Sequence, residues 1–123
     1  MIKILVVDDE ETILLNLVAY LEDEGFETLS AADAEQALAL IEEKKPDVGI
    51  VDLRLPGMNG NELIIEAHKL LPSMKFVIHT GSTDYVLPDE IRAIGVGEAL
   101  VVNKPVSDMS VLSNVINRLL GEQ

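Results

Sequence analysis

The strongest constraint on the fold is a pattern that the sequence repeats five times: a short apolar run, followed by a longer stretch of helical character. The runs are residues 2–7, 48–51, 76–79 and 99–102, together with a weaker and more polar one at residues 26–32. Short apolar runs are typical of buried strands, whereas apolar residues three and four positions apart are typical of helices that cover a core. The sequence therefore predicts five strands that alternate with five helices.

Residues that favour helix ends support this interpretation. The predicted helices lie in residues 14–21, 34–44, 63–71, 88–94 and 112–120. Gly25 suits the C-terminal cap of the first helix, and Pro46 ends the second. Pro88 favours a first helical turn, so we expect a loop over 81–87 and a short helix after it. Ser107 or Asp108 is expected to cap the last helix.

Alternating strands and helices predict an α/β fold: a parallel sheet, doubly wound, with right-handed crossovers and helices on both faces. With 48% hydrophobic and 25% charged residues the chain has the composition of a globular protein. Aromatic residues make up only 3%, so the core must consist mainly of Leu, Ile, Val and Ala, as buried parallel strands favour. A length of 123 residues suits one domain over residues 1–123.

Composition also excludes several classes of protein. No apolar run reaches the roughly 18 residues of a membrane span, and the N-terminus MIKILVVDDE becomes acidic too early for a signal peptide, so we expect a cytoplasmic location without membrane contact. The absence of cysteine excludes disulfides and thiolate metal sites. A formal charge of −13 opposes contact with nucleic acid and favours cations and basic protein surfaces.

Polar residues follow the predicted strands at their carboxyl ends. Asp8 and Asp9 follow the first strand, Asp52 the third, Thr80 the fourth and Lys104 the fifth. Ligands of doubly wound sheets bind at this edge. Two carboxylates about 4 Å apart repel by about 4 kcal/mol at an effective dielectric constant near 20, so the three acids require positive charge. Lys104 supplies one charge, and a divalent cation is the natural second source.

These residue types suit phosphoryl transfer to a carboxylate. Mg²⁺ prefers oxygen ligands and is commonly held by one or two carboxylates together with a phosphate oxygen. Transfer of a phosphoryl group depends mostly on positioning and on neutralisation of charge. We therefore expect Asp52 to be the nucleophile and Asp8 and Asp9 to hold the metal. Thr80 and Lys104 are the expected donors to the phosphoryl oxygens.

Four motifs resemble the receiver domain of two-component response regulators, the family that includes the single-domain chemotaxis regulators. They are VVDDE at 6–10, PDVGIVDLRLPGMNG at 46–60, HTGS at 79–82 and NKP at 103–105. The resemblance implies a flavodoxin-like sheet with strand order 2-1-3-4-5. It also implies Mg²⁺-dependent transfer of a phosphoryl group to Asp52 from a histidine kinase or phosphotransfer protein. Phosphorylation would shift the face formed by helix 4, strand 5 and helix 5, and so control a protein partner or an output domain absent from this chain.

The resemblance also assigns individual residues. It implies a metal shell of Asp9, Asp52 and the main-chain carbonyl of Arg54, with Asp8 acting through water. It implies a cis peptide between Lys104 and Pro105, which only a proline makes plausible. The chain would catalyse only its own phosphorylation and dephosphorylation and would otherwise not be an enzyme.

Several positions depart from the family pattern. Val101 replaces the usual aromatic residue three positions before the lysine, so an aromatic swing cannot be the output mechanism. Gly81 follows Thr80, Val106 replaces the usual Phe, and Pro88 shortens or shifts helix 4. These departures leave open a degenerate receiver, a binding module that works without phosphorylation.

An aspartyl-phosphate phosphatase is less favoured, because it would have a second acid two residues after its nucleophile, where this chain has Arg54. The acids after the first strand could serve merely to cap a helix, and Asp52 could merely form a turn. The position of Asp52 on the strand itself favours the role of acceptor over that of a turn residue.

Two features outside the predicted site favour structural roles. Strand alternation turns His79 away from Thr80, so a structural role suits this histidine better than a catalytic one. Leu15 and Ala19 lie off the core face of the first helix, as an apolar fringe or, less favoured, as a surface for a weak homodimer or a kinase.

Overall fold

The computed structural model describes residues 1–81, 84–97, 100–104 and 109–121. Five strands alternate with five helices along these residues. Their bounds are β1 Lys3–Val7, α1 Glu11–Asp23, β2 Glu27–Ala31, α2 Ala34–Lys44, β3 Val48–Asp52, α3 Gly60–Leu70, β4 Lys75–Thr80, α4 Asp89–Ile94, β5 Val101–Asn103 and α5 Ser110–Gly121. The described chain therefore has the alternation that the sequence predicts.

All five strands are parallel and lie in the order β2-β1-β3-β4-β5. β1 pairs with β2 on one side and β3 on the other, so that Val7 lies opposite both Ala31 and Val51. The predicted doubly wound fold and its strand order are confirmed. The carboxyl ends of β1, β3, β4 and β5 consequently lie at one edge of the sheet.

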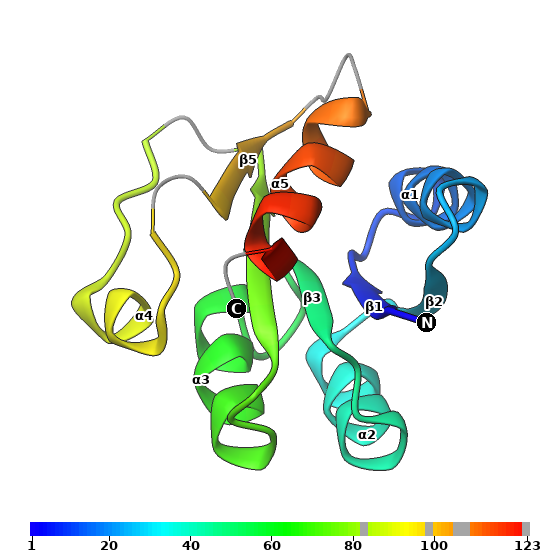
Figure 1. Ribbon diagram of the computed structural model, residues 1–123. Helices are drawn as coiled ribbons and strands as arrows, with labels where there is room; N and C mark the ends of the chain where they lie inside the picture. Colours follow the sequence, from blue (N-terminus) through cyan, green and yellow to red (C-terminus); the bar gives the residue numbers. More distant parts are fainter. Residues whose placement is uncertain (82–83, 98–99, 105–108, 122–123) are drawn as a thin grey trace.

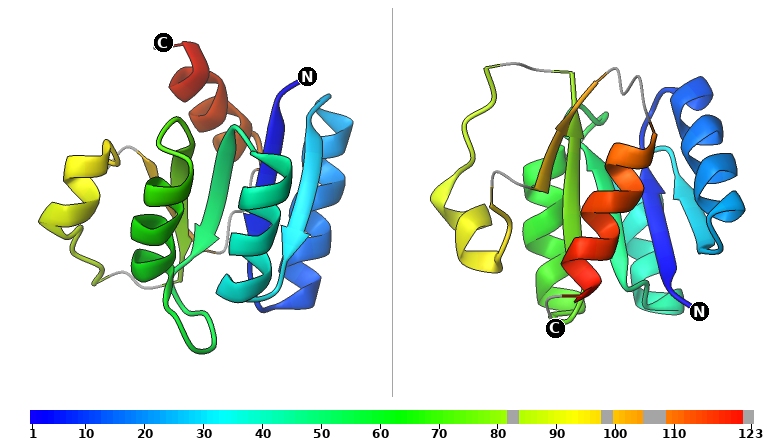
Figure 2. Two further views of the ribbon diagram at one scale, coloured as in Figure 1. Left: turned by 90° about the horizontal axis from the view of Figure 1, so that it is seen from below. Right: turned by 45° about the horizontal axis from the view of Figure 1, so that its top comes forward.

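Helices cover both faces of this sheet, with α1 and α5 on one face and α2, α3 and α4 on the other (Figures 1 and 2). The side chains of β1 alternate between the two layers: Ile4 and Val6 pack toward α1 and α5, and Leu5 and Val7 toward α2 and α3. Because successive side chains of a strand point to opposite faces, a run that is apolar at every position serves both layers.

Three helix ends follow the expected chemistry. Gly25 follows α1 with a φ of +93°, a conformation that costs glycine little. α2 ends at Lys44, and its C-cap residue Lys45 adopts the left-handed conformation before Pro46. A capping box starts α3: the Asn59 side chain accepts from the Glu62 N–H, and Glu62 accepts from the Asn59 N–H. This cap fixes the start of α3 beside the end of β3.

Element bounds differ from the predicted ones where polar residues continue a strand. β3 extends through Asp52 and β4 through Thr80, so both side chains stand on the sheet itself. β5 begins at Val101 and includes Asn103, so Leu100 lies before the strand and not in it as predicted, and the predicted first residue, 99, lies outside the described residues. α4 is short and has Pro88 as its N-cap, in agreement with the predicted helix start.

Some expectations fall on residues outside the described ranges. They are the helix cap at 107 or 108, the cis peptide at Pro105, and the surroundings of Val106. Within the described ranges, no helix combines the length and apolar character that crossing a bilayer requires. Leu15 and Ala19 are exposed on α1, as predicted.

Candidate functional site

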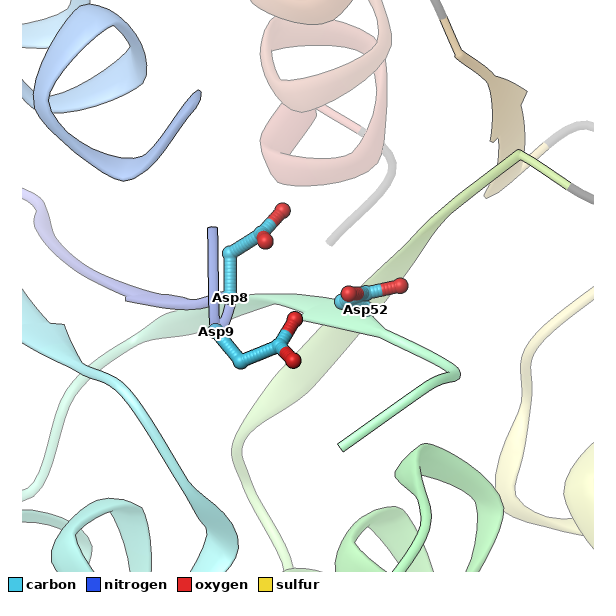
Figure 3. Close-up of side chains that lie close together, drawn as sticks. All are labelled: Asp8, Asp9 and Asp52. Atoms are coloured by element: carbon cyan, nitrogen blue, oxygen red, sulfur yellow. The ribbon is translucent and has the colours of Figure 1, made fainter. Parts of the chain in front are cut away.

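Three carboxylates gather where β1 and β3 end (Figure 3). Each of Asp8, Asp9 and Asp52 offers an oxygen atom, and these atoms lie within 4.8 Å of one another. Asp8 and Asp52 are buried, whereas Asp9 is exposed. The sheet thus holds two of the acids in place while the third faces solvent.

Lys104 balances part of this negative charge. Its Nζ lies 2.8 Å from Asp8 Oδ2, 3.4 Å from Asp52 Oδ2 and 3.7 Å from Glu10 Oε1. Its main-chain N–H donates to the Thr80 carbonyl over 2.7 Å, which extends the pairing of β5 with β4 and directs the lysine to the site. The shortest ion pair of the lysine is therefore with Asp8 and not with the expected nucleophile Asp52.

The combined effect of burial and nearby charges is to raise the pKa of both Asp52 and Lys104. Burial raises the pKa of Asp52 above its usual 3.8 despite the Arg54 N–H and the Lys104 charge, which lower it; the neighbouring Asp8 charge raises it further. Burial alone would lower the pKa of Lys104, but its hydrogen bond to Asp8 and the Asp52 charge outweigh burial and raise it above 10.5. The lysine therefore stays cationic, and further positive charge beside Asp52 would favour its carboxylate form.

The β3–α3 connection is shaped around Asp52. The Arg54 N–H donates to Asp52 Oδ1 over 3.2 Å, and the Gly60 N–H donates to the Leu53 carbonyl over 3.0 Å. A Cβ atom at Gly60 would collide with the Asp52 carbonyl oxygen and the Leu53 Cα atom. Glycine is needed here because α3 begins in direct contact with the main chain that carries Asp52.

A small open cleft of about 230 Å³ lies above the carboxylates. Asp9, Asp52, Arg54 and Lys104 line it together with Glu10 and Gly81. Asp8 lies beneath, in contact with Lys104, and Thr80 is buried at the end of β4. The structure thus brings the predicted site residues to one edge of the sheet, with Thr80 below the cleft surface rather than on it.

The donors in this cleft fit a hard divalent cation. They are carboxylate oxygens, with Asp9 open to solvent and with the cleft beside it roomy enough for bound water. Mg²⁺ prefers oxygen ligands and usually keeps several waters, so it suits one exposed acid and one buried acid better than a closed cage.

The structure adds contacts of Glu10 and Tyr85 and the register of His79, none of which sequence reasoning supplied. Glu10 is a further carboxylate facing Lys104. Tyr85 donates its hydroxyl hydrogen to Asn61 Oδ1 over 2.8 Å and so ties the segment after β4 to α3. His79 lies opposite Asp52 in the β3–β4 register, hence on the same face of the sheet, and is 4% exposed. The alternation of side chains within β4 predicted that His79 and Thr80 point to opposite faces. It did not predict that His79 pairs with Asp52 of β3.

Comparison with known proteins finds a matching family model and several similar sequences. The family model described as the response regulator receiver domain matches residues 4–117. The DNA-binding response regulator MtrA of Mycolicibacterium smegmatis is 35% identical over 119 residues, which cover 95% of this chain and 50% of MtrA. Sporulation initiation phosphotransferase F of Bacillus subtilis is 30% identical over 93 residues, 76% of this chain and 75% of that protein. This chain spans about half the length of the MtrA relatives.

Solved structures agree in fold. A CheY-like receiver domain protein from Methanospirillum hungatei superposes with a TM-score of 0.83 at 34% identity, over 98% of this chain and 95% of that one. The response regulator TrrA from Thermotoga maritima, solved in complex with Mg²⁺-BeF, superposes with a TM-score of 0.85 at 29% identity, over 97% and 99% of the two chains. Both similarities extend over nearly the whole chain.

Proposed function

The chain belongs to the response regulator receiver domain family, and from that premise we propose that it accepts a phosphoryl group on Asp52 in a Mg²⁺-dependent reaction. The observation that carries this proposal is the Asp52 carboxylate, fixed by β3, open to a cleft and 3.4 Å from the Lys104 ammonium. The donor would be a histidine kinase, a phosphotransfer protein or a small acyl phosphate.

The proposed step exchanges one bond to phosphorus for another. An Asp52 carboxylate oxygen forms the new P–O bond while the bond between phosphorus and the donor's leaving atom breaks, and that atom keeps the bonding electron pair. Lys104 and Thr80 would stabilise charge on the phosphoryl oxygens as it grows. This chemistry demands positioning and charge balance and little else from the protein.

Asp9, Asp52 and the Arg54 carbonyl would hold Mg²⁺, with Asp8 acting through water. Bound there, the ion would neutralise negative charge on the acids and on the incoming phosphoryl group. The same charge balance explains why the resting site needs a cation: the described site has four acids, Asp8, Asp9, Glu10 and Asp52, around one lysine.

Incubation with acetyl phosphate tests the acceptor. With Mg²⁺ present, intact mass spectrometry should detect one phosphoryl group on the wild type and none on Asp52→Asn. Asp23→Asn, at the exposed end of α1, is the matched control and should label normally. Removing Mg²⁺ with a chelator should prevent labelling. Stable labelling of Asp52→Asn would refute the assignment, and repeated turnover of phosphate monoesters would instead favour a phosphatase.

The proposed output is a change of the α4-β5-α5 face. Val101 stands half-buried in β5 where the family usually has an aromatic residue, so the change must be reported by other side chains. Hydrogen exchange with and without a beryllofluoride mimic should differ in α4 or α5. Unchanged exchange there, with the mimic bound, would favour a binding module that works without phosphorylation.

Proteins are the proposed partners of this domain. MtrA is named as a DNA-binding regulator, but this chain spans only about half of such relatives. Its charge of −13 opposes binding to DNA phosphates, so any contact with DNA is expected from other parts of a regulator.

A further inference from the structure

A second, larger cavity lies on the α1 and α5 side of the sheet, next to the phosphoacceptor cleft. Its volume is about 660 Å³, within the range of roughly 300–1,000 Å³ that is typical of small-molecule sites. Ile13, Leu17 and Tyr20 of α1 form one wall, and Met109, just before α5, contributes to the other. We call this space the α1–α5 cavity. Most of its surface is apolar.

The sheet side of the α1–α5 cavity is formed by His79. The side chain is buried, and neither ring nitrogen has a hydrogen-bond partner among the described residues. A neutral imidazole has one donor and one acceptor nitrogen. Leaving either group buried and unpaired costs about 1–3 kcal/mol. An occupant that paired with the ring would recover part of that free energy.

Charge at the cavity favours an uncharged occupant. Glu10 and Lys104 line the end nearest the phosphoacceptor cleft and lie 3.7 Å apart, so both signs of charge are present at that end and neither stands alone. Burial and the nearby Lys104 charge lower the pKa of His79 to about 4, so its ring is neutral at physiological pH. Among the described residues, the remaining walls carry no formal charge.

We propose that the α1–α5 cavity binds a small uncharged molecule, with an apolar ring or chain against α1 and a hydroxyl or amide group hydrogen-bonded to His79. The His79 nitrogens are shielded from solvent, so a wall side chain must shift to admit the polar group. Met109 is suited to this shift because its side chain is unbranched and flexible. Binding needs no phosphorylation and is independent of the function proposed for Asp52.

Titration with phenol and with toluene, followed through the amide signals of ¹⁵N-labelled protein, tests this site. Both probes have an apolar ring, but only phenol can pair with His79. Phenol should shift signals of α1, His79 and Met109, and the ratio of its affinity to that of toluene should be about tenfold higher in the wild type than in a variant without the imidazole, as one hydrogen bond of about 1.4 kcal/mol implies.

His79→Leu should lose affinity for phenol relative to toluene while still binding toluene, which also shows that the cavity survives the substitution. Asp23→Asn, at the exposed end of α1, should bind phenol as the wild type does. An affinity ratio of phenol to toluene that is the same in the wild type and in His79→Leu would overturn the proposal, and so would shifts confined to another face.

Discussion

Replacing His79 with phenylalanine should remove much of the protein's sensitivity to mild acid. The side chain is 4% exposed, and burial is the main reason that its pKa is lowered from 6.5 to about 4. Between these two pH values the unfolded chain binds a proton at His79 and the native protein does not. The stability that His79 contributes is therefore fully present above pH 6.5 and is lost as pH falls toward 4.

The size of the effect follows from the two pKa values. One unit of pKa difference corresponds to about 1.36 kcal/mol. When the pH is lowered from about 7.5 to about 5, the free energy of unfolding should therefore decrease by about 2 kcal/mol more for the wild type than for His79→Phe. This is a large share of the roughly 5–15 kcal/mol by which domains are stable.

Urea unfolding at a series of pH values, followed by the circular dichroism of the helices, measures the difference. His79→Leu serves as a second variant without a titrating group. Its stability near neutral pH will differ from that of His79→Phe through packing, but the two should share one pH dependence. A wild type whose unfolding free energy falls with acid in parallel with both variants would refute the reasoning.

Three further substitutions follow from the site. Lys104→Met leaves buried aspartates without their cation and should lower metal-free stability by about 3–5 kcal/mol, with part restored by Mg²⁺; a deficit that Mg²⁺ leaves unchanged would contradict this. Gly60→Ala places a Cβ atom against main chain and should cost about 1–3 kcal/mol in urea unfolding and slow acetyl phosphate labelling of Asp52, whereas Gly97→Ala, where a Cβ atom meets nothing, should change neither. Tyr85→Phe removes the hydroxyl bonded to α3 and should cost about 1 kcal/mol; thermal unfolding measures the loss, and an unchanged midpoint would show that the bond contributes nothing.

The fold could be predicted from the sequence because both the apolar pattern and the order of the elements along the chain restrict the possible topologies. Five apolar runs separated by helical stretches leave few topologies, and right-handed crossovers restrict them further. The same reasoning reached Asp8, Asp9, Asp52 and Lys104, because residues at the carboxyl ends of parallel strands must share an edge. Distances in the structure bear out their proximity.

Other features of the site could not be predicted from the sequence, because they depend on strand register and on close packing in space. The sequence does not indicate that the Lys104 ammonium lies nearer to Asp8 than to Asp52, because this depends on the conformation of the lysine side chain. The contact at Gly60 depends on where α3 begins in space, and the sequence shows only a glycine in a loop. Placing His79 beside Asp52 requires the β3–β4 register, which a difference of one residue would reverse.

The pairing of Lys104 with Asp8 has a consequence for synthesis on the ribosome. These partners are 96 residues apart, and β1, β2 and β3, with all three aspartates, emerge long before β5. A nascent chain that pairs its first three strands must therefore hold several carboxylates together without their lysine. We expect a metal ion or delayed closure of this edge to stabilise the carboxylates during that interval, so the charge balance of the site is completed only after β5 and Lys104 have been made.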